Sequence, residues 1–259
     1  MYLKRKADAY LNAWKSDPNR SPLIIKGPRQ VGKTETIDYF AAHNYRSVVE
    51  INFVEEPKYR AITADGYGAN TIVRNISLID PAKKFIPGDT LIFFDEIQAH
   101  PDIATALKFF KIDGKYDVIC SGSMLGISYK QIESNSVGYK TDYEMRSLDF
   151  EEFLWARGYD EAVIESMFTH LCDATPFSEV EMNVFSTAFM DYCVLGGMPA
   201  VVASHIRTGT FEGTLQLQRQ LILDYQEDIR KYAQGPDQAR ILNVFNHIPV
   251  QLAKENKKF

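Results

Sequence analysis

Eight residues near the start of the chain have the types and spacing that bind phosphate. The octet GPRQVGKT, residues 27–34, matches the pattern GxxxxGK[ST] in full. Its glycines let the main chain approach an anion, and a following helix N-terminus favours negative charge. Lys33 is expected to lie between the β- and γ-phosphates, and the Thr34 hydroxyl to be a ligand of Mg²⁺. The stretch predicts nucleotide binding, with the binding residues Gly27, Pro28, Arg29, Gln30, Val31, Gly32, Lys33, Thr34 and Glu35.

Two adjacent carboxylates form the second chemical stretch. The apolar run TLIFF, residues 90–94, is followed by Asp95 and Glu96. Neighbouring positions on a strand point to opposite faces, so the two acids do different work unless the strand turns at its end. Asp95 is expected to hold the Mg²⁺ shell, and Glu96 to orient and deprotonate the attacking water. Glu96 and Lys33 are therefore the expected catalytic residues, and a solvated strand end is the alternative interpretation.

Small hydroxyl side chains end a further β-rich segment, KYDVICSGS, residues 115–123. A parallel sheet presents its ligand groups at the carboxyl ends of its strands. One of Ser121 and Ser123 is therefore expected to contact the γ-phosphate as a polar sensor, and a glycine-serine turn without such a role is the alternative. Arg146 is the nearest arginine in the same chain for the γ-phosphate, although a surface arginine is the favoured interpretation.

The elements that must position these residues alternate between strand and helix patterns. An apolar run precedes the phosphate-binding octet, and a helix-forming stretch follows it. Such βα units predict an α/β fold of the P-loop NTPase type, a parallel sheet with helices on both faces and ligands at the carboxyl ends of the strands. The further predicted strands are 46–53, 90–96, 115–123 and 139–148, and the predicted helices are 2–15, 71–78 and 101–110.

Strand patterns vanish after Asp149, and helical periodicity replaces them. The predicted organisation is an ATP-binding core over 1–149 and a mainly helical domain over 150–259. Within the latter, Ser178 and Glu181 have the spacing of a capping box. Met182, Phe185, Phe189 and Tyr192 then repeat at three- and four-residue steps, which predicts one apolar face packed in the core. This region offers no chemical constellation of its own.

Composition narrows the function classes. The 259 residues are 45% hydrophobic and 24% charged, and the formal net charge of -5 argues against nucleic-acid binding through the whole surface. Three cysteines lie far apart, without a CxxC pair, which predicts neither disulfides nor a zinc site and favours the cytoplasm. No segment has the length of apolar sequence that a membrane span requires, so no membrane association and no export are expected.

The choice of nucleotide follows from motifs that the chain lacks. A GTPase is expected to carry an NKxD motif that reads the base, and the sequence has none. A nucleoside kinase is expected to carry an arginine-rich lid over both substrates, and no such cluster is present. ATP with Mg²⁺ is therefore the expected ligand pair, with ADP as the product.

Several segments together resemble one known family. They are GPRQVGKT, LIFFDEIQ, ICSGSMLGI, SVGYKTDYEMRSLDFEEFLWARG, YCVLGGMPAVV and IPVQLAKENKKF. The combination is similar to a prokaryotic family of AAA-type ATPases that join an ATP-binding core to an uncharacterised helical C-terminal domain. The resemblance implies an AAA fold, ATP with Mg²⁺ and oligomerisation, with Lys33, Thr34, Asp95 and Glu96 corresponding by position. It also implies that Asn52 restrains the catalytic glutamate.

Two departures from the family pattern bear on function. Many relatives have a Gly-Arg pair where this chain reads Val137-Gly138-Tyr139, so the origin of an arginine finger is open. Relatives usually continue well past an ending like NKKF, which suggests a fragment that lacks the last part of the helical domain.

Three functions are compatible with these patterns. The leading one is a Mg²⁺-dependent ATPase whose hydrolysis switches the helical domain, within a homo-oligomer that supplies an arginine in trans. The second is a nucleotide-dependent binding or signalling module with little turnover, which a phosphate-release assay distinguishes. The third is a DNA-associated AAA protein, which a salt-dependent DNA affinity distinguishes. The protein or nucleic-acid partner is unknown from sequence.

Overall fold

The computed structural model describes residues 1–123, 138–233 and 235–252. The chain divides into two compact units, Met1–Glu212 and Gly213–Phe259. The first contains the sheet and the helices up to α9 (Pro199–Thr208), and the second contains α10 (Thr214–Tyr232) and α11 (Pro236–Leu252). The boundary predicted between residues 149 and 150 lies within the first unit, at the start of helix α6 (Phe150–Ala156), and stays a prediction.

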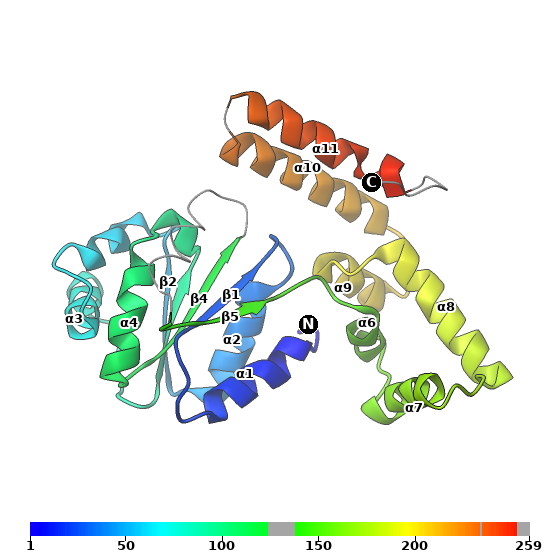
Figure 1. Ribbon diagram of the computed structural model, residues 1–259, viewed down its shortest axis with the longest axis horizontal. Coiled ribbons are helices and arrows are strands. Elements are labelled where there is room, and N and C mark those ends of the chain that lie inside the picture. The colour runs from blue at the N-terminus through cyan, green and yellow to red at the C-terminus, as the bar shows by residue number, and fades with distance from the viewer. Residues whose placement is uncertain (124–137, 234, 253–259) are drawn as a thin grey trace. The chain divides into compact units, whose positions relative to one another are not determined.

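The first unit is built on a five-stranded parallel sheet of order β2-β3-β4-β1-β5 (Figure 1). The strand that precedes the phosphate-binding octet, β1, lies between β4 and β5, while the strand that carries the acid pair, β3, lies between β2 and β4. The predicted α/β fold with a parallel sheet is confirmed. The strands are β1 (Leu23–Gly27), β2 (Ser47–Asn52), β3 (Thr90–Asp95), β4 (Asp117–Ser123) and β5 (Thr141–Glu144).

Helices cover both faces of this sheet (Figure 1). Ile92 and Phe94 of β3 belong to one core cluster, which includes residues of α3 and α4. Leu91 and Phe93 belong to the other cluster, with residues of α1 and α2. Alternate side chains of β3 thus enter opposite layers, which is why this strand reads as one continuous apolar run. The helices of the two layers are α1 (Lys6–Ser16), α2 (Lys33–Asn44), α3 (Ala69–Ile79) and α4 (Ile103–Asp113).

Four helices follow the sheet within the first unit. The predicted capping box at α8 is present, since the N–H of Ser178 donates to the Glu181 carboxylate at 2.8 Å and Glu181 N–H donates to the Ser178 hydroxyl at 3.3 Å. A second capping box, between Asp149 and Glu152, begins α6. The helices are α6 (Phe150–Ala156), α7 (Glu161–Cys172), α8 (Glu179–Leu195) and α9 (Pro199–Thr208).

The apolar face predicted on α8 is only partly buried. Phe185 is buried, but Met182 and Phe189 are 50% and 49% exposed. The prediction of a continuous core face is therefore wrong for these two residues. The neighbouring helices cover only a narrow stripe of α8, whose buried members also include Ala188, and a helix buries no more than the face that it turns to a neighbour.

The connection from β5 to α6, residues 145–149, packs its backbone against two glycines, Gly27 and Gly197. A Cβ atom on Gly27, at the end of β1, would lie 2.1 Å from the Met145 carbonyl oxygen. A Cβ atom on Gly197, before α9, would lie 2.0 Å from the Leu148 carbonyl oxygen. Because only glycine permits such close backbone contact, the connection is held directly against both the phosphate-binding strand and the start of α9.

The second unit is a helical hairpin of α10 (Thr214–Tyr232) and α11 (Pro236–Leu252). The rings of Tyr225 and Phe245 pack with their centroids 6.3 Å apart, and the Gln226 amide donates to Asn246 at 2.9 Å. In the ranges that the structure describes, no helix of either unit is both long enough and apolar enough to traverse a lipid bilayer.

Candidate nucleotide-binding site

The phosphate-binding octet forms the loop that joins β1 to α2. Gly27 ends β1 and is paired in register with Ser123 of β4. Gly32 adopts a left-handed conformation, with φ of 90°, and immediately precedes the first turn of α2. Gln30 is also left-handed, with φ of 62°. The loop therefore turns sharply and delivers a twelve-residue helix whose N-terminus favours an anion.

The side chains of the loop point in several directions. Val31 is buried in the core beneath the loop, Pro28 and Arg29 are half-buried, and Gln30 is exposed. Glu35 is exposed on the first turn of α2. The side chains of these predicted binding residues therefore share no common direction. A phosphate would be bound mainly by the main-chain N–H groups of the loop.

Lys33 lies inside the loop. Its Nζ donates to the carbonyl oxygens of Pro28 at 2.7 Å and Gly27 at 3.1 Å. Burial lowers the pKa of the Lys33 ammonium, and the carboxylates of Glu96 and Asp95 act in the opposite direction. The cation of the octet and the acid pair thus share one electrostatic environment.

Side chains from α2, β4 and β2 meet at Asp95. The Thr34 hydroxyl donates to Asp95 Oδ2 at 3.2 Å, and the Ser121 hydroxyl donates to Asp95 Oδ1. The Asn52 amide lies 3.4 Å from Asp95 Oδ2, consistent with the register that pairs Asn52 with Asp95. The fold therefore brings together Thr34 and Asp95, the two residues predicted as metal ligands, at the carboxyl edge of the sheet.

This arrangement fits a magnesium ion. Thr34 and Asp95 offer oxygen donors at hydrogen-bond distance from each other, and Mg²⁺ prefers oxygen donors. Within the described residues, no group of three His, Cys, Asp or Glu side chains could hold a metal alone. A magnesium ion here would therefore complete its shell with water and phosphate oxygens, as it commonly does.

Glu96 leaves the strand in a different conformation from Asp95. β3 ends at Asp95, and Glu96 is left-handed, with φ of 54°. This turn removes the alternation that would send the two acids to opposite faces. The Glu96 carboxylate accepts a hydrogen bond from the amide of Gln98. The Asn52 side chain contacts Asp95 and accepts from Val54 N–H, whereas its implied role in restraining the glutamate stays a prediction.

The two serines of β4 have different partners. Ser121 is bound to Asp95, whereas the buried Ser123 hydroxyl has no hydrogen-bond partner among the described residues. Arg146 has a side chain that is 78% exposed and pairs with Glu144 at 3.2 Å, in agreement with the surface interpretation. Val137, in the position compared with the Gly-Arg pair of relatives, lies outside the described residues.

Two residues of the site region, Arg5 and Gln98, were not predicted from the sequence. Arg5 belongs to a short basic run at the N-terminus, and nothing local marks it as buried. Gln98 follows the acid pair by two positions, and only its place directly after a buried strand could have indicated it.

The sheet, the loop and the acid pair define the class of protein, a P-loop NTPase domain. The chain belongs to the family described as "AAA domain", whose profile matches residues 19–154, more than half of its length. A second profile, "Domain of unknown function (DUF8612)", matches residues 186–259. The resemblance to AAA ATPases with an uncharacterised C-terminal domain is thereby confirmed.

Two solved structures align with most of the chain. C. elegans PCH-2 is 11% identical, with 96% of this chain and 68% of that chain covered and a TM-score of 0.41. Domain III of the Thermotoga maritima replication initiation protein DnaA is 15% identical, with 94% of each chain covered and a TM-score of 0.45. No curated protein matches the sequence.

Proposed function

We propose that this protein binds ATP with Mg²⁺ and hydrolyses it, and that the nucleotide state is transmitted to the helices that begin at α6. The observation that supports this most strongly is the contact between the Thr34 hydroxyl and Asp95. The first is the hydroxyl of the phosphate-binding octet, and the second is the leading acid of the pair on β3. Their meeting at the carboxyl edge of a parallel sheet is what a Mg²⁺-nucleotide site requires.

Each residue has a separate role in this proposal. Apart from Pro28, which has no main-chain N–H, residues 27–32 surround the phosphates with main-chain N–H groups, and Lys33 adds a positive charge. Thr34 and Asp95 hold the metal, which when bound would neutralise charge on the phosphates. Glu96 takes a proton from the attacking water. Ser123 is the proposed sensor of the γ-phosphate, because it is paired with Gly27 at the start of the loop and its hydroxyl has no partner among the described residues.

Calorimetric titration with ATP, ADP and GTP, with and without Mg²⁺, tests binding. We expect ATP and ADP to bind, ATP to bind more tightly with Mg²⁺, and GTP to bind weakly. A steady-state phosphate-release assay then tests turnover. ATP binding without phosphate release would favour the nucleotide-dependent binding module, and absence of ATP binding would contradict both functions. A homo-oligomer that supplies an arginine in trans stays a prediction.

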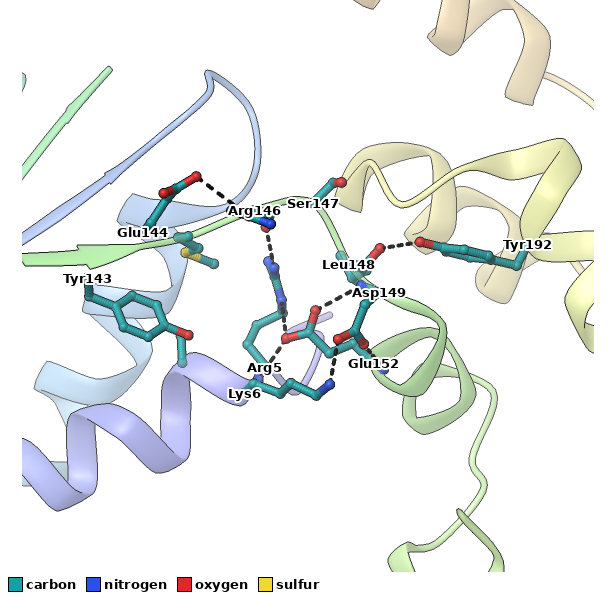
Figure 2. A pocket seen from close by; sticks show the side chains of 12 residues that line it. Arg5, Lys6, Tyr143, Glu144, Arg146, Ser147, Leu148, Asp149, Glu152 and Tyr192 are labelled. Atoms are coloured by element: carbon teal, nitrogen blue, oxygen red, sulfur yellow. Dashed lines mark hydrogen bonds and ion pairs between the residues drawn. The ribbon is translucent and has the colours of Figure 1, made fainter. Parts of the chain in front are cut away.

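The proposed transmission to α6 depends on a buried arginine, Arg5, which is 5% exposed (Figure 2). Its Nη1 donates to the carbonyl oxygen of Val31, in the phosphate-binding loop, at 2.7 Å. Its Nη2 donates to the carbonyl oxygen of Arg146, in the connection to α6, at 2.6 Å. One guanidinium therefore joins the loop to the connection, and a shift of either carbonyl changes a charge-assisted hydrogen bond.

Glu152 of α6 is the ionic partner of Arg5. Its Oε1 lies 3.1 Å from Arg5 Nε, without the angle of a hydrogen bond, and accepts from Lys6 N–H at 2.7 Å. Its Oε2 accepts from Asp149 N–H at 3.1 Å as part of the capping box. A cavity of about 400 Å³ lies beside this network, lined by the N-terminal segment, residues 143–149 and Tyr192 (Figure 2).

Replacing Arg5 by lysine should separate nucleotide binding from the response of α6. Lysine keeps the charge but lacks the planar fork that reaches three groups at once. Trp155 on α6 can report the response in a Trp14→Phe background, because the chain has only two tryptophans. We expect the difference in Trp155 emission between the ATP and ADP states to be lost. ATP affinity should change less than about threefold, since Arg5 donates to the Val31 carbonyl oxygen and the phosphates are bound by main-chain N–H groups.

The control is Arg46→Lys, because Arg46 has a side chain that is 83% exposed and pairs with Asp89 away from the loop. It should retain the emission difference. An emission difference that survives Arg5→Lys would contradict transmission through Arg5.

Arg5→Met should destabilise the fold by about 3–5 kcal/mol, because it leaves the Glu152 carboxylate buried without its ionic partner. Adding Glu152→Gln to this variant should recover part of the lost stability.

A further inference from the structure

We propose that Gln98 is a positioning residue for hydrolysis, which holds the Glu96 carboxylate in the orientation that a general base needs. This inference rests on the proposed ATPase function. Gln98 lies in a short 3₁₀ turn, η2 (Ile97–Ala99), directly after β3. Its Nε2 donates to Glu96 Oε2. Gln98 therefore bears on the reaction through Glu96, and not through the nucleotide.

The Gln98 side chain is confined by the neighbouring strand. A Cβ atom on Gly122 of β4 would lie 2.8 Å from Gln98 Oε1 and 3.3 Å from Ile97 Cγ1, so the Gln98 amide packs against the strand at Gly122 and would have to move if a methyl group were added there. Gln98 Oε1 is buried and has no hydrogen-bond partner among the residues that the structure describes. A flipped amide would place this oxygen against the Glu96 carboxylate. In the observed orientation, Gln98 Nε2 donates to the Glu96 carboxylate, and Gln98 Oε1 is left buried without a hydrogen bond, which costs about 1–3 kcal/mol.

Glu96 needs such a support because the sheet supplies none. Its left-handed backbone takes it out of β3, and its side chain is half-buried. Asp95, in contrast, is held by Ser121, Thr34 and Asn52. A base is effective only when its accepting oxygen is aligned with the proton, and a third group commonly orients it. Each acid of the pair thus has its own supporting side chains.

Gln98→Leu removes the donor and keeps similar bulk. We expect kcat to fall between about 10- and 100-fold, as for a misaligned catalytic group, with KM and ADP affinity unchanged. In the Glu96→Gln background, the same substitution should have no further effect on residual turnover, because the group that it positions is already lost. An equal loss in both backgrounds would overturn the proposal, since Gln98 would then act by another route.

A second pair of variants tests the packing without nucleotide. Gly122→Ala should lower both the melting temperature and kcat, because the added methyl displaces the Gln98 amide and also crowds Ile97. In the Gln98→Ala background, Gly122→Ala should lower the melting temperature less, since only the contact with Ile97 remains. Equal losses in the two backgrounds would contradict the proposed confinement of Gln98. A wild-type chain that releases no phosphate would instead contradict the ATPase function and the catalytic part of this inference, and the melting data would still test the packing.

Discussion

Replacing Lys33 by alanine is expected to weaken ATP binding by at least about 100-fold, which corresponds to about 3 kcal/mol. The buried ammonium donates to the Pro28 and Gly27 carbonyls, which places it inside the loop that is proposed to bind the phosphates. Charge-assisted hydrogen bonds to a phosphate contribute about 1.5–3 kcal/mol each, and Lys33 is expected to reach two phosphates. Calorimetric titration of the variant with ATP and ADP measures the loss.

The size of the loss should differ between nucleotides. ADP lacks the γ-phosphate, so Lys33→Ala should reduce ADP affinity less than ATP affinity. Lys58→Ala is the matched control, because Lys58 is an exposed lysine paired with Glu56 at 3.8 Å. This control variant should bind ATP as the wild type does. Unchanged ATP affinity in a folded Lys33→Ala variant would remove Lys33 from the proposed site.

Glu96→Gln is expected to bind ATP with nearly wild-type affinity and to lower kcat by about 100- to 10,000-fold. Glutamine keeps the size of the side chain and can still accept from Gln98 through its carbonyl oxygen, so the surrounding contacts are retained. What it loses is the basic oxygen that takes the proton from water. Single-turnover phosphate release, measured beside ATP titration, separates these two effects.

The control for this variant is Glu55→Gln, since Glu55 is an exposed acid outside the pair. Its turnover should equal that of the wild type. An active Glu96→Gln protein would contradict the assignment of Glu96 as the base, while leaving the nucleotide-binding proposal intact. Loss of ATP binding in Glu96→Gln would instead indicate that Glu96 holds the bound nucleotide or the metal.

Much of the sheet could be predicted because its signals are local. The apolar run before Asp95 predicted a strand covered on both faces, and its alternate side chains enter the two core clusters. The capping box at Ser178 was equally local. The apolar face of α8 was not predicted correctly at Met182 and Phe189, since periodicity shows which residues share a face but not whether a neighbouring element covers it.

The candidate site divides in the same way. The residue types and spacing of the octet and the acid pair were sufficient to infer nucleotide chemistry, because a short contiguous loop does most of the phosphate binding. The partners of the acids could not be inferred. The resemblance implied that Asn52 restrains the glutamate, but the register of β2 and β3 places its side chain beside Asp95, and the side chain that contacts Glu96 is Gln98.

The sequence by itself determined the order of strands and helices, the phosphate-binding loop and the identity of the two acids. All of these depend on patterns within about ten residues, where backbone geometry and side-chain periodicity act directly. Only the tertiary structure decided that Thr34, Ser121 and Asn52 meet at Asp95, and that Arg5 joins Val31 to Arg146. The physical reason is that strand order and register are set by packing between distant segments, which no local pattern records.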